Sequence, residues 1–291
     1  MRWEGKGAAM AVLLIALLCY ALCVILARVV YQHGGDALAV LISRMGVFFF
    51  FLWIYFVISG RSLALPRREL RGSLLVGAVV AVQSYAYYSS FQYLPVSLAA
   101  LIFYLYPTLV ALGSRLVART PLTSALVAAL LAAFMGLALV LQASVEGLET
   151  HGLLRAFTAA IGMTTTVLLA SRLLARIDTQ VMTFYSSGVT SAVYVLAAFI
   201  VGAATPADFA GWAALIAMPL IYTVGVLGWY SSMPRLGTVR VAFISNFEPL
   251  FTGILAARLL DVALSPRQIL GGALVIGAVL GLQLANRRTG G

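Results

Sequence analysis

The chain has 291 residues, of which 63% are hydrophobic and 10% are charged, and its mean hydropathy is +1.03. This composition excludes a soluble domain and indicates one polytopic membrane domain, with the lipid bilayer as its surroundings. The formal net charge of +10 does not indicate nucleic-acid binding, because basic residues gather in the cytoplasmic loops of membrane proteins.

Apolar stretches long enough to cross a bilayer recur along the whole chain. A span needs about 20 mostly apolar residues, and on that rule the sequence predicts an all-α protein with ten transmembrane helices. These cover residues 8–30, 37–58, 72–92, 97–117, 123–142, 152–172, 179–202, 211–233, 238–259 and 268–286. The first resembles a secretory signal in following Arg2 and Lys6, but it is too long, so we interpret it as a retained span.

The basic residues predict the orientation. With both termini in the cytoplasm, 14 of the 19 Lys and Arg residues fall on the inner side. This bias follows the positive-inside rule. We therefore expect an integral protein of a bacterial inner membrane, with N and C termini cytoplasmic.

The two halves of the chain repeat each other. Tyr88–Ser90 recurs 142 residues later as Tyr230–Ser232, and at the same offset Pro107 meets Pro249. Five spans per copy is an odd number, so the second copy enters the membrane from the opposite side. The sequence therefore predicts two inverted-topology repeats, as in secondary transporters that work by alternating access. Their expected bounds are 1–145 and 146–291.

A polar, broken stretch is predicted in the middle of the ninth span. Glu248 is the only carboxylate near the centre of any predicted helix, and buried charges are functional candidates. Pro249 lacks an N–H, so the Ser245 carbonyl is expected to lose its helical partner. We predict that Ser245 and Asn246 bind substrate. The alternative is a structural kink whose polar groups satisfy one another.

Two further roles are assigned to this stretch and its repeat partner. Pro107 and Pro249 are the predicted hinges, since a helix that lacks a hydrogen bond bends there easily. Glu248 is the candidate for energy coupling, but no second carboxylate or histidine accompanies it. A downhill uniport is therefore favoured over proton coupling.

Polar and aromatic side chains define the remaining candidates. Arg44 lies inside the second span, as an interfacial anchor or as an electrostatic element of the site. Flat rings with a polar edge suit a small amphipathic ligand. We expect a central cavity whose substrate-binding residues are Gln83, Tyr87, Tyr104, Tyr222 and Trp229, together with Ser245 and Asn246. Tyrosine and tryptophan also gather at the two membrane–water interfaces. For any single aromatic residue of this set, such an interfacial position is the alternative to substrate binding.

Other features are expected to be structural. Small residues at Ala132 and Gly136, and at Gly277 and Gly281, allow helices to approach closely, so the fifth and tenth spans are interpreted as a framework whose two helices can face each other. Thr164–Thr166 are expected to bond their own helix. No spacing typical of a catalytic, metal or cofactor site occurs, so we expect neither enzymatic activity, nor a metal, nor a cofactor.

The pattern resembles the ten-helix drug/metabolite transporter superfamily with two EamA-type repeats. The matching residues are Arg44, Leu94–Pro107 and Val241–Phe251, the last with its Glu-Pro pair. The first span departs from the common pattern at Cys19–Cys23. The resemblance implies a small-molecule transporter, and the aromatic third span is most similar to bacterial exporters of aromatic and other neutral amino acids.

Two other functions remain open alongside amino-acid export. One is broad-specificity efflux of drugs and toxic amphipathic compounds, and the other, from a different class, is a non-transporting membrane sensor. The expected partner is a small-molecule substrate, an amino acid or similar metabolite. The oligomeric state is open, a monomer included.

Overall fold

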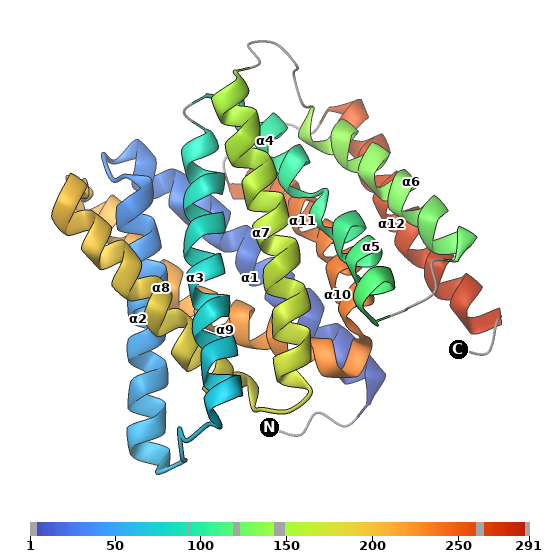
Figure 1. The fold of residues 1–291 in the computed structure, drawn as a ribbon. Coiled ribbons are helices and arrows are strands. Elements are labelled where there is room, and N and C mark those ends of the chain that lie inside the picture. Colours follow the sequence, from blue (N-terminus) through green and yellow to red (C-terminus); the bar gives the residue numbers. More distant parts are fainter. Residues whose placement is uncertain (1–4, 92, 119–122, 143–148, 260–264, 289–291) are drawn as a thin grey trace. The chain divides into compact units, whose positions relative to one another are not determined.

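The computed structural model describes residues 5–91, 93–118, 123–142, 149–259 and 265–288. Within these ranges every regular element is a helix (Figure 1). The helices are α1 (Lys6–Gln32), α2 (Ala37–Ser59), α3 (Arg67–Ser90), α4 (Val96–Phe103), α5 (Tyr106–Ala118), α6 (Ser124–Leu141), α7 (Thr150–Leu174), α8 (Thr179–Val201), α9 (Phe209–Leu236), α10 (Thr238–Ile244), the 3-10 helix η1 (Ser245–Phe247), α11 (Glu248–Leu259) and α12 (Pro266–Arg288).

Each of the ten predicted spans is helical in the structure, and two of them are broken near their middle. The fourth span consists of α4 and α5, and the ninth consists of α10, η1 and α11. Eight segments of the described chain are long and apolar enough to cross a membrane. The other two spans are α3, whose C-terminal half is polar, and α12, whose apolar part is shorter.

Contacts divide the chain into two compact units. Unit 1 comprises Met1–Val82 and Leu169–Leu236, and unit 2 comprises Gln83–Leu168 and Gly237–Gly291. Each unit therefore combines segments from both halves of the sequence. The predicted repeat boundary after residue 145 falls in residues 143–148, outside the described residues. That division concerns sequence similarity, and it stays a prediction.

In unit 1, small residues let α1 and α9 approach closely. A Cβ atom at Gly225 would lie 3.2 Å from the Cβ of Cys19, and one at Gly228 would lie 3.2 Å from the Cβ of Ala16. Close approach through glycine, alanine and similar residues is a common way for helices to associate in membranes. Cys19, which is a free thiol, is thus a packing residue in this structure.

Hydroxyl groups of α8 donate hydrogen bonds to backbone carbonyl groups of α3 within the same unit. Thr190 Oγ1 donates to the Gly77 carbonyl at 2.9 Å, and the Tyr194 hydroxyl donates to the Ala81 carbonyl at 3.1 Å. Both side chains are buried. Each bond uses a second lone pair of a helical carbonyl, so the contact costs α3 none of its own hydrogen bonds.

The loops α1–α2 and α8–α9 of unit 1 are tied together by Asp36. Its carboxylate caps α2 by accepting from the Ala39 N–H at 2.8 Å, and it also accepts from the Ala204 N–H at 2.9 Å. An aspartate at a helix N-cap satisfies donors that would otherwise have no partner. Here one cap also holds a loop that lies 168 residues away in sequence.

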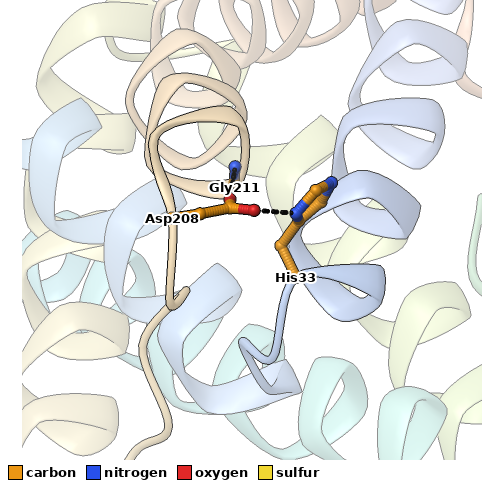
Figure 2. A network of polar contacts seen from close by, with 3 residues as sticks. All are labelled: His33, Asp208 and Gly211. Carbon is orange, nitrogen blue, oxygen red and sulfur yellow. Dashed lines mark hydrogen bonds and ion pairs between the residues drawn. The ribbon is translucent and has the colours of Figure 1, made fainter.

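A second tie between these loops runs through Asp208. Its Oδ2 atom lies 2.6 Å from His33 Nδ1, and the Gly211 N–H at the start of α9 donates to Oδ1 at 3.0 Å. Figure 2 shows the side chains of Asp208 and His33 pointing toward each other. These contacts lower the pKa of the Asp208 carboxyl, with the Gly211 hydrogen bond the larger cause. The ionised carboxylate is thus the form that fits this loop.

In unit 2, α6 and α12 pack side by side (Figure 1). A Cβ atom at Gly136 would lie 2.7 Å from the Gly271 carbonyl oxygen, so backbone touches backbone at this point. The expected pairing of the two helices is correct, but the partner glycine is a different one. Gly277 and Gly281 have no atom within 4 Å of an added Cβ. The helix period alone did not identify which glycines of the tenth span face α6.

Candidate functional site

The two broken helices of unit 2 place polar side chains in the interior. Pro107 and Pro249 each stand second in the helix that follows the break, a position where a missing N–H costs no helical bond. The Ser245 carbonyl accepts from the Glu248 N–H through the 3-10 turn η1. The expectation that this carbonyl loses its partner is therefore wrong, because the tighter turn supplies a donor one residue earlier.

Side chains from the two breaks bond to each other. The Tyr104 hydroxyl is hydrogen-bonded to the Glu248 carboxyl group, and the Tyr106 hydroxyl is hydrogen-bonded to Ser245. Tyr104, Tyr106 and Ser245 are 7%, 2% and 1% exposed. A buried polar network in which each hydroxyl has a partner fixes the relative position of its helices. The two breaks thus form one connected polar centre.

The contacts of this polar centre are nearly symmetric under the sequence repeat. At the offset of 142 residues, Tyr104 corresponds to Asn246 and Tyr106 corresponds to Glu248. Exchanging the copies turns the Tyr104–Glu248 contact into one between Asn246 and Tyr106. The observed contact of Tyr106 is with Ser245, one residue earlier. Asn246 instead donates to the Phe243 carbonyl at 2.8 Å.

An aromatic cluster adjoins the polar centre. The Tyr87 ring lies 4.6 Å from the Phe103 ring and 4.9 Å from that of Phe91, measured between centroids. Phe103 in turn lies 5.5 Å from Tyr106. These distances are typical of favourable aromatic pairs. Gln83, one turn before Tyr87 on α3, is buried.

Unit 1 carries the other candidate residues. The Arg44 guanidinium carbon lies 4.3 Å from the centre of the Tyr222 ring, which is a cation–π geometry. Tyr20 and Phe48 flank the same ring, each at 5.9 Å. Trp229, which is 3% exposed, packs against Tyr230 at 5.1 Å.

The predicted site residues therefore fall into two groups, one in each unit. Tyr104, Ser245 and Glu248 are brought together, and so are Arg44 and Tyr222. The expectation of one central cavity that all of them line stays a prediction. Sequence reasoning missed the contributions of four residues that complete the two groups, Tyr20, Phe48, Phe103 and Tyr106. The Pro107 break was a signal for Phe103 and Tyr106, since both lie within four residues of it.

The side chains at these positions offer several groups that can recognise a small molecule. Rings, hydroxyls, an amide, one carboxyl group and one guanidinium can bind and orient a small molecule. Among the described residues, no group of three or more His, Cys, Asp or Glu side chains is arranged to hold a metal ion.

Comparison with known proteins decides the family. The profile of the EamA-like transporter family matches residues 7–142 and again residues 150–284. The chain belongs to the EamA-like transporter family. This EamA-like protein is an integral membrane transporter of small substrates, with two copies of the family's repeat. A search of curated proteins by sequence returned no significant match.

The fold of this EamA-like transporter also has a solved counterpart. A structure described as "Crystal structure of protein" superposes with a TM-score of 0.83. It shares 19% sequence identity, and the alignment covers 98% of this chain and 99% of the other. At this identity the likeness concerns the fold alone.

Proposed function

We propose that this protein exports aromatic and other neutral amino acids from the cytoplasm of a bacterium, across the inner membrane, by alternating access. The observation that carries the proposal is the pairing of rings with neutral hydrogen-bonding groups in the interior. Tyr87 and Phe103 offer apolar ring surface beside the polar centre of Tyr104 and Ser245. A ligand with an aromatic side chain and a small polar head matches this combination.

The direction of transport and the mechanism belong to the same proposal. The two repeats enter the membrane from opposite sides, with both termini in the cytoplasm, and they exchange conformations. Pro107 and Pro249 are the proposed hinges. Structures of the inward- and outward-open states are expected to differ in bending at these two breaks, and bending elsewhere contradicts the assignment.

The test is counterflow in proteoliposomes. Purified protein is reconstituted into vesicles loaded with unlabelled phenylalanine, tyrosine, leucine or alanine, and entry of labelled phenylalanine is followed. We expect faster entry with phenylalanine or tyrosine inside than with alanine or with empty vesicles. Exchange of a lipophilic cationic dye without exchange of any amino acid would replace this function with drug efflux. No exchange of either kind would favour a non-transporting sensor.

Energy coupling is tested through Glu248. Its hydrogen bond to Tyr104 supports a fixed structural role, so we propose a uniport driven by the cytoplasmic substrate gradient. Wild-type flux should then be the same with and without an imposed pH gradient, and Glu248→Gln should change both fluxes equally. If wild-type flux rises steeply with the gradient and Glu248→Gln loses only that dependence, Glu248 is the coupling residue. Tyr104→Phe is the matched variant, since it removes the same hydrogen bond and keeps the carboxyl group.

A further inference from the structure

Two buried polar side chains of unit 2 take no part in the clusters described above. Gln83 on α3 is 7% exposed and Thr166 on α7 is 1% exposed. The amide oxygen of Gln83 and the hydroxyl of Thr166 have no hydrogen-bond partner within the described part of the chain. A buried polar atom without a partner loses its hydration and gains nothing in return. In the interior of a transporter, such atoms are candidate contacts for a bound molecule.

Thr166 differs in this respect from the threonines beside it. Thr164 Oγ1 donates to the Ala160 carbonyl at 2.8 Å, and Thr165 Oγ1 donates to the Ile161 carbonyl at 2.9 Å. These two bonds confirm the expected bonding of a threonine to its own helix. For Thr166 the same expectation is wrong, and its hydroxyl remains available in the interior.

The two helices run antiparallel and touch beside these residues. Arg155 Nη1 donates to the Ser89 carbonyl at 3.3 Å near one end of the contact. Two turns further along α7, a Cβ atom at Gly162 would lie 2.6 Å from the Cβ of Gln83. Thr166 stands one turn beyond Gly162, and therefore on the same face of α7.

The side-chain directions bring the two polar groups toward each other. A side chain on a helix leans toward the N-terminus of that helix. Gln83 therefore leans along α3 toward the level of Thr166, whereas Thr166 leans along α7 back toward the level of Gly162. Because the helices are antiparallel, these directions place both side chains on the same stretch of the α3–α7 contact.

The polar atoms of Gln83 and Thr166 suit a ligand group that donates hydrogen bonds. An amide oxygen accepts hydrogen bonds, and a threonine hydroxyl accepts as well as donates. A primary ammonium group carries three N–H donors and so can satisfy both oxygens at once. Since neither side chain is ionised, the pair suits a zwitterion of zero net charge better than a cation. Tyr87, one turn from Gln83 on the same face of α3, offers a ring to the same ligand.

We propose that Gln83 and Thr166 form the subsite that binds the ammonium group of a neutral amino acid. The proposal rests on the amino-acid export proposed above and assigns to Thr166 a role in specificity. Thr166 recognises the ammonium group, and the rings of unit 2 contact the substrate side chain.

The experiment is competition against phenylalanine counterflow in proteoliposomes. Unlabelled phenylalanine and its analogue without the amino group, 3-phenylpropionate, serve as the two competitors. Thr166→Val keeps the side-chain shape and removes the hydroxyl. It should raise the half-inhibitory concentration of phenylalanine about ten-fold, as expected for one hydrogen bond to a charged group, and leave that of 3-phenylpropionate unchanged. Gln83→Met should produce the same selective loss.

Two variants serve as controls. Thr165→Val removes a hydroxyl that is bonded to its own helix and should change neither value. Thr166→Ser restores the hydroxyl and should recover phenylalanine inhibition. If Thr166→Val fails to fold, Gln83→Met and Thr166→Ser decide the question.

The outcomes separate this inference from the proposed function. Equal weakening of both competitors, or no change in either, overturns the inference and assigns the pair to packing or to a bound water molecule. A wild-type protein that exchanges no amino acid overturns the proposed function itself, and this result is seen before any variant is compared.

Discussion

Single side chains on one helix have different environments, and Tyr85 and Tyr87 on α3 illustrate this. Tyr85 is 59% exposed, whereas Tyr87 is partly buried against Phe103. Both are tyrosines in the same polar stretch, so their types alone do not separate them. The structure assigns Tyr87 to the interior aromatic cluster and leaves Tyr85 on the outer surface of the helix.

This contrast gives a matched pair of variants. Tyr87→Ala should weaken aromatic substrates about two- to ten-fold, because aromatic pairs contribute roughly 0.5–1.5 kcal/mol beyond their buried area. Alanine transport should change little. Tyr85→Ala is the control and should leave both unchanged. Inhibition constants in counterflow measure the effect, and equal losses for phenylalanine and alanine would contradict a ring contact.

Asp208 gives a prediction about acid stability. Its folded pKa lies below the ordinary value of 3.8 because the carboxylate accepts from Gly211 and contacts His33. A lowered pKa stabilises the fold at pH values above 3.8, and this contribution disappears as the pH falls through the lower folded value. Asp208→Asn should therefore lower the melting temperature in detergent at pH 7, and this deficit should shrink as the pH is lowered below 3.8 toward 2.5. A deficit of the same size at both pH values would show that the charge is not responsible.

The packing of whole helices depends on glycines that contact the backbone of a neighbouring helix. At Gly136 an added methyl group would meet the Gly271 carbonyl, which cannot rotate away as a side chain can. Gly136→Ala should reduce the free energy of unfolding by about 1–3 kcal/mol. Gly277→Ala enters open space and should be neutral or slightly stabilising, since alanine favours helix over glycine by about 1 kcal/mol. Denaturant unfolding in detergent compares the two, and equal effects would contradict the contact at Gly136.

The breaks in the fourth and ninth spans could be predicted in part. Proline in an apolar span placed both breaks within a few residues, because its missing N–H is a local property of the sequence. The 3-10 turn at Ser245–Phe247 and the bonds from Tyr104 and Tyr106 across to the other helix were not predictable in this way. They depend on which helix lies opposite, and that is not encoded in the period of a single span.

At the scale of the whole molecule, the apolar composition was sufficient to predict the class of protein and the number of spans. It was not sufficient to predict which helices pack together. Unit 1 pairs α1 with α9 and α2 with α8, segments more than 100 residues apart. Such pairings are decided by shape, for example Gly225 against Cys19, and no local pattern reports them. For the same reason the candidate residues were found by type, while their division between two units was not foreseen.

The proposed orientation has a direct test in the loops. Ser62 lies in a loop expected in the cytoplasm, and Ala203 lies in one expected outside; both are exposed. With Cys19 and Cys23 replaced, Ala203→Cys should react with a membrane-impermeant maleimide added to intact cells, and Ser62→Cys should react only after lysis. The ion pair of Arg61 with Asp178, 2.7 Å between Nη2 and Oδ2, joins two loops assigned to one side. The reverse labelling pattern would invert the topology.

The distance along the chain between the paired helices of unit 1 also affects how the protein is made. His33 and Asp208 are 175 residues apart, and a ribosome that adds about 5–20 residues per second needs on the order of ten seconds or more to cover that length. During this interval α1 and α2 have left the ribosome without α9 and α8. The close contacts of α1 at Gly225 and Gly228 can form only after α9 has been made. Bulky substitutions at Gly225 and Gly228 should lower the amount of protein in the membrane, and should do so before they change the transport rate of each molecule.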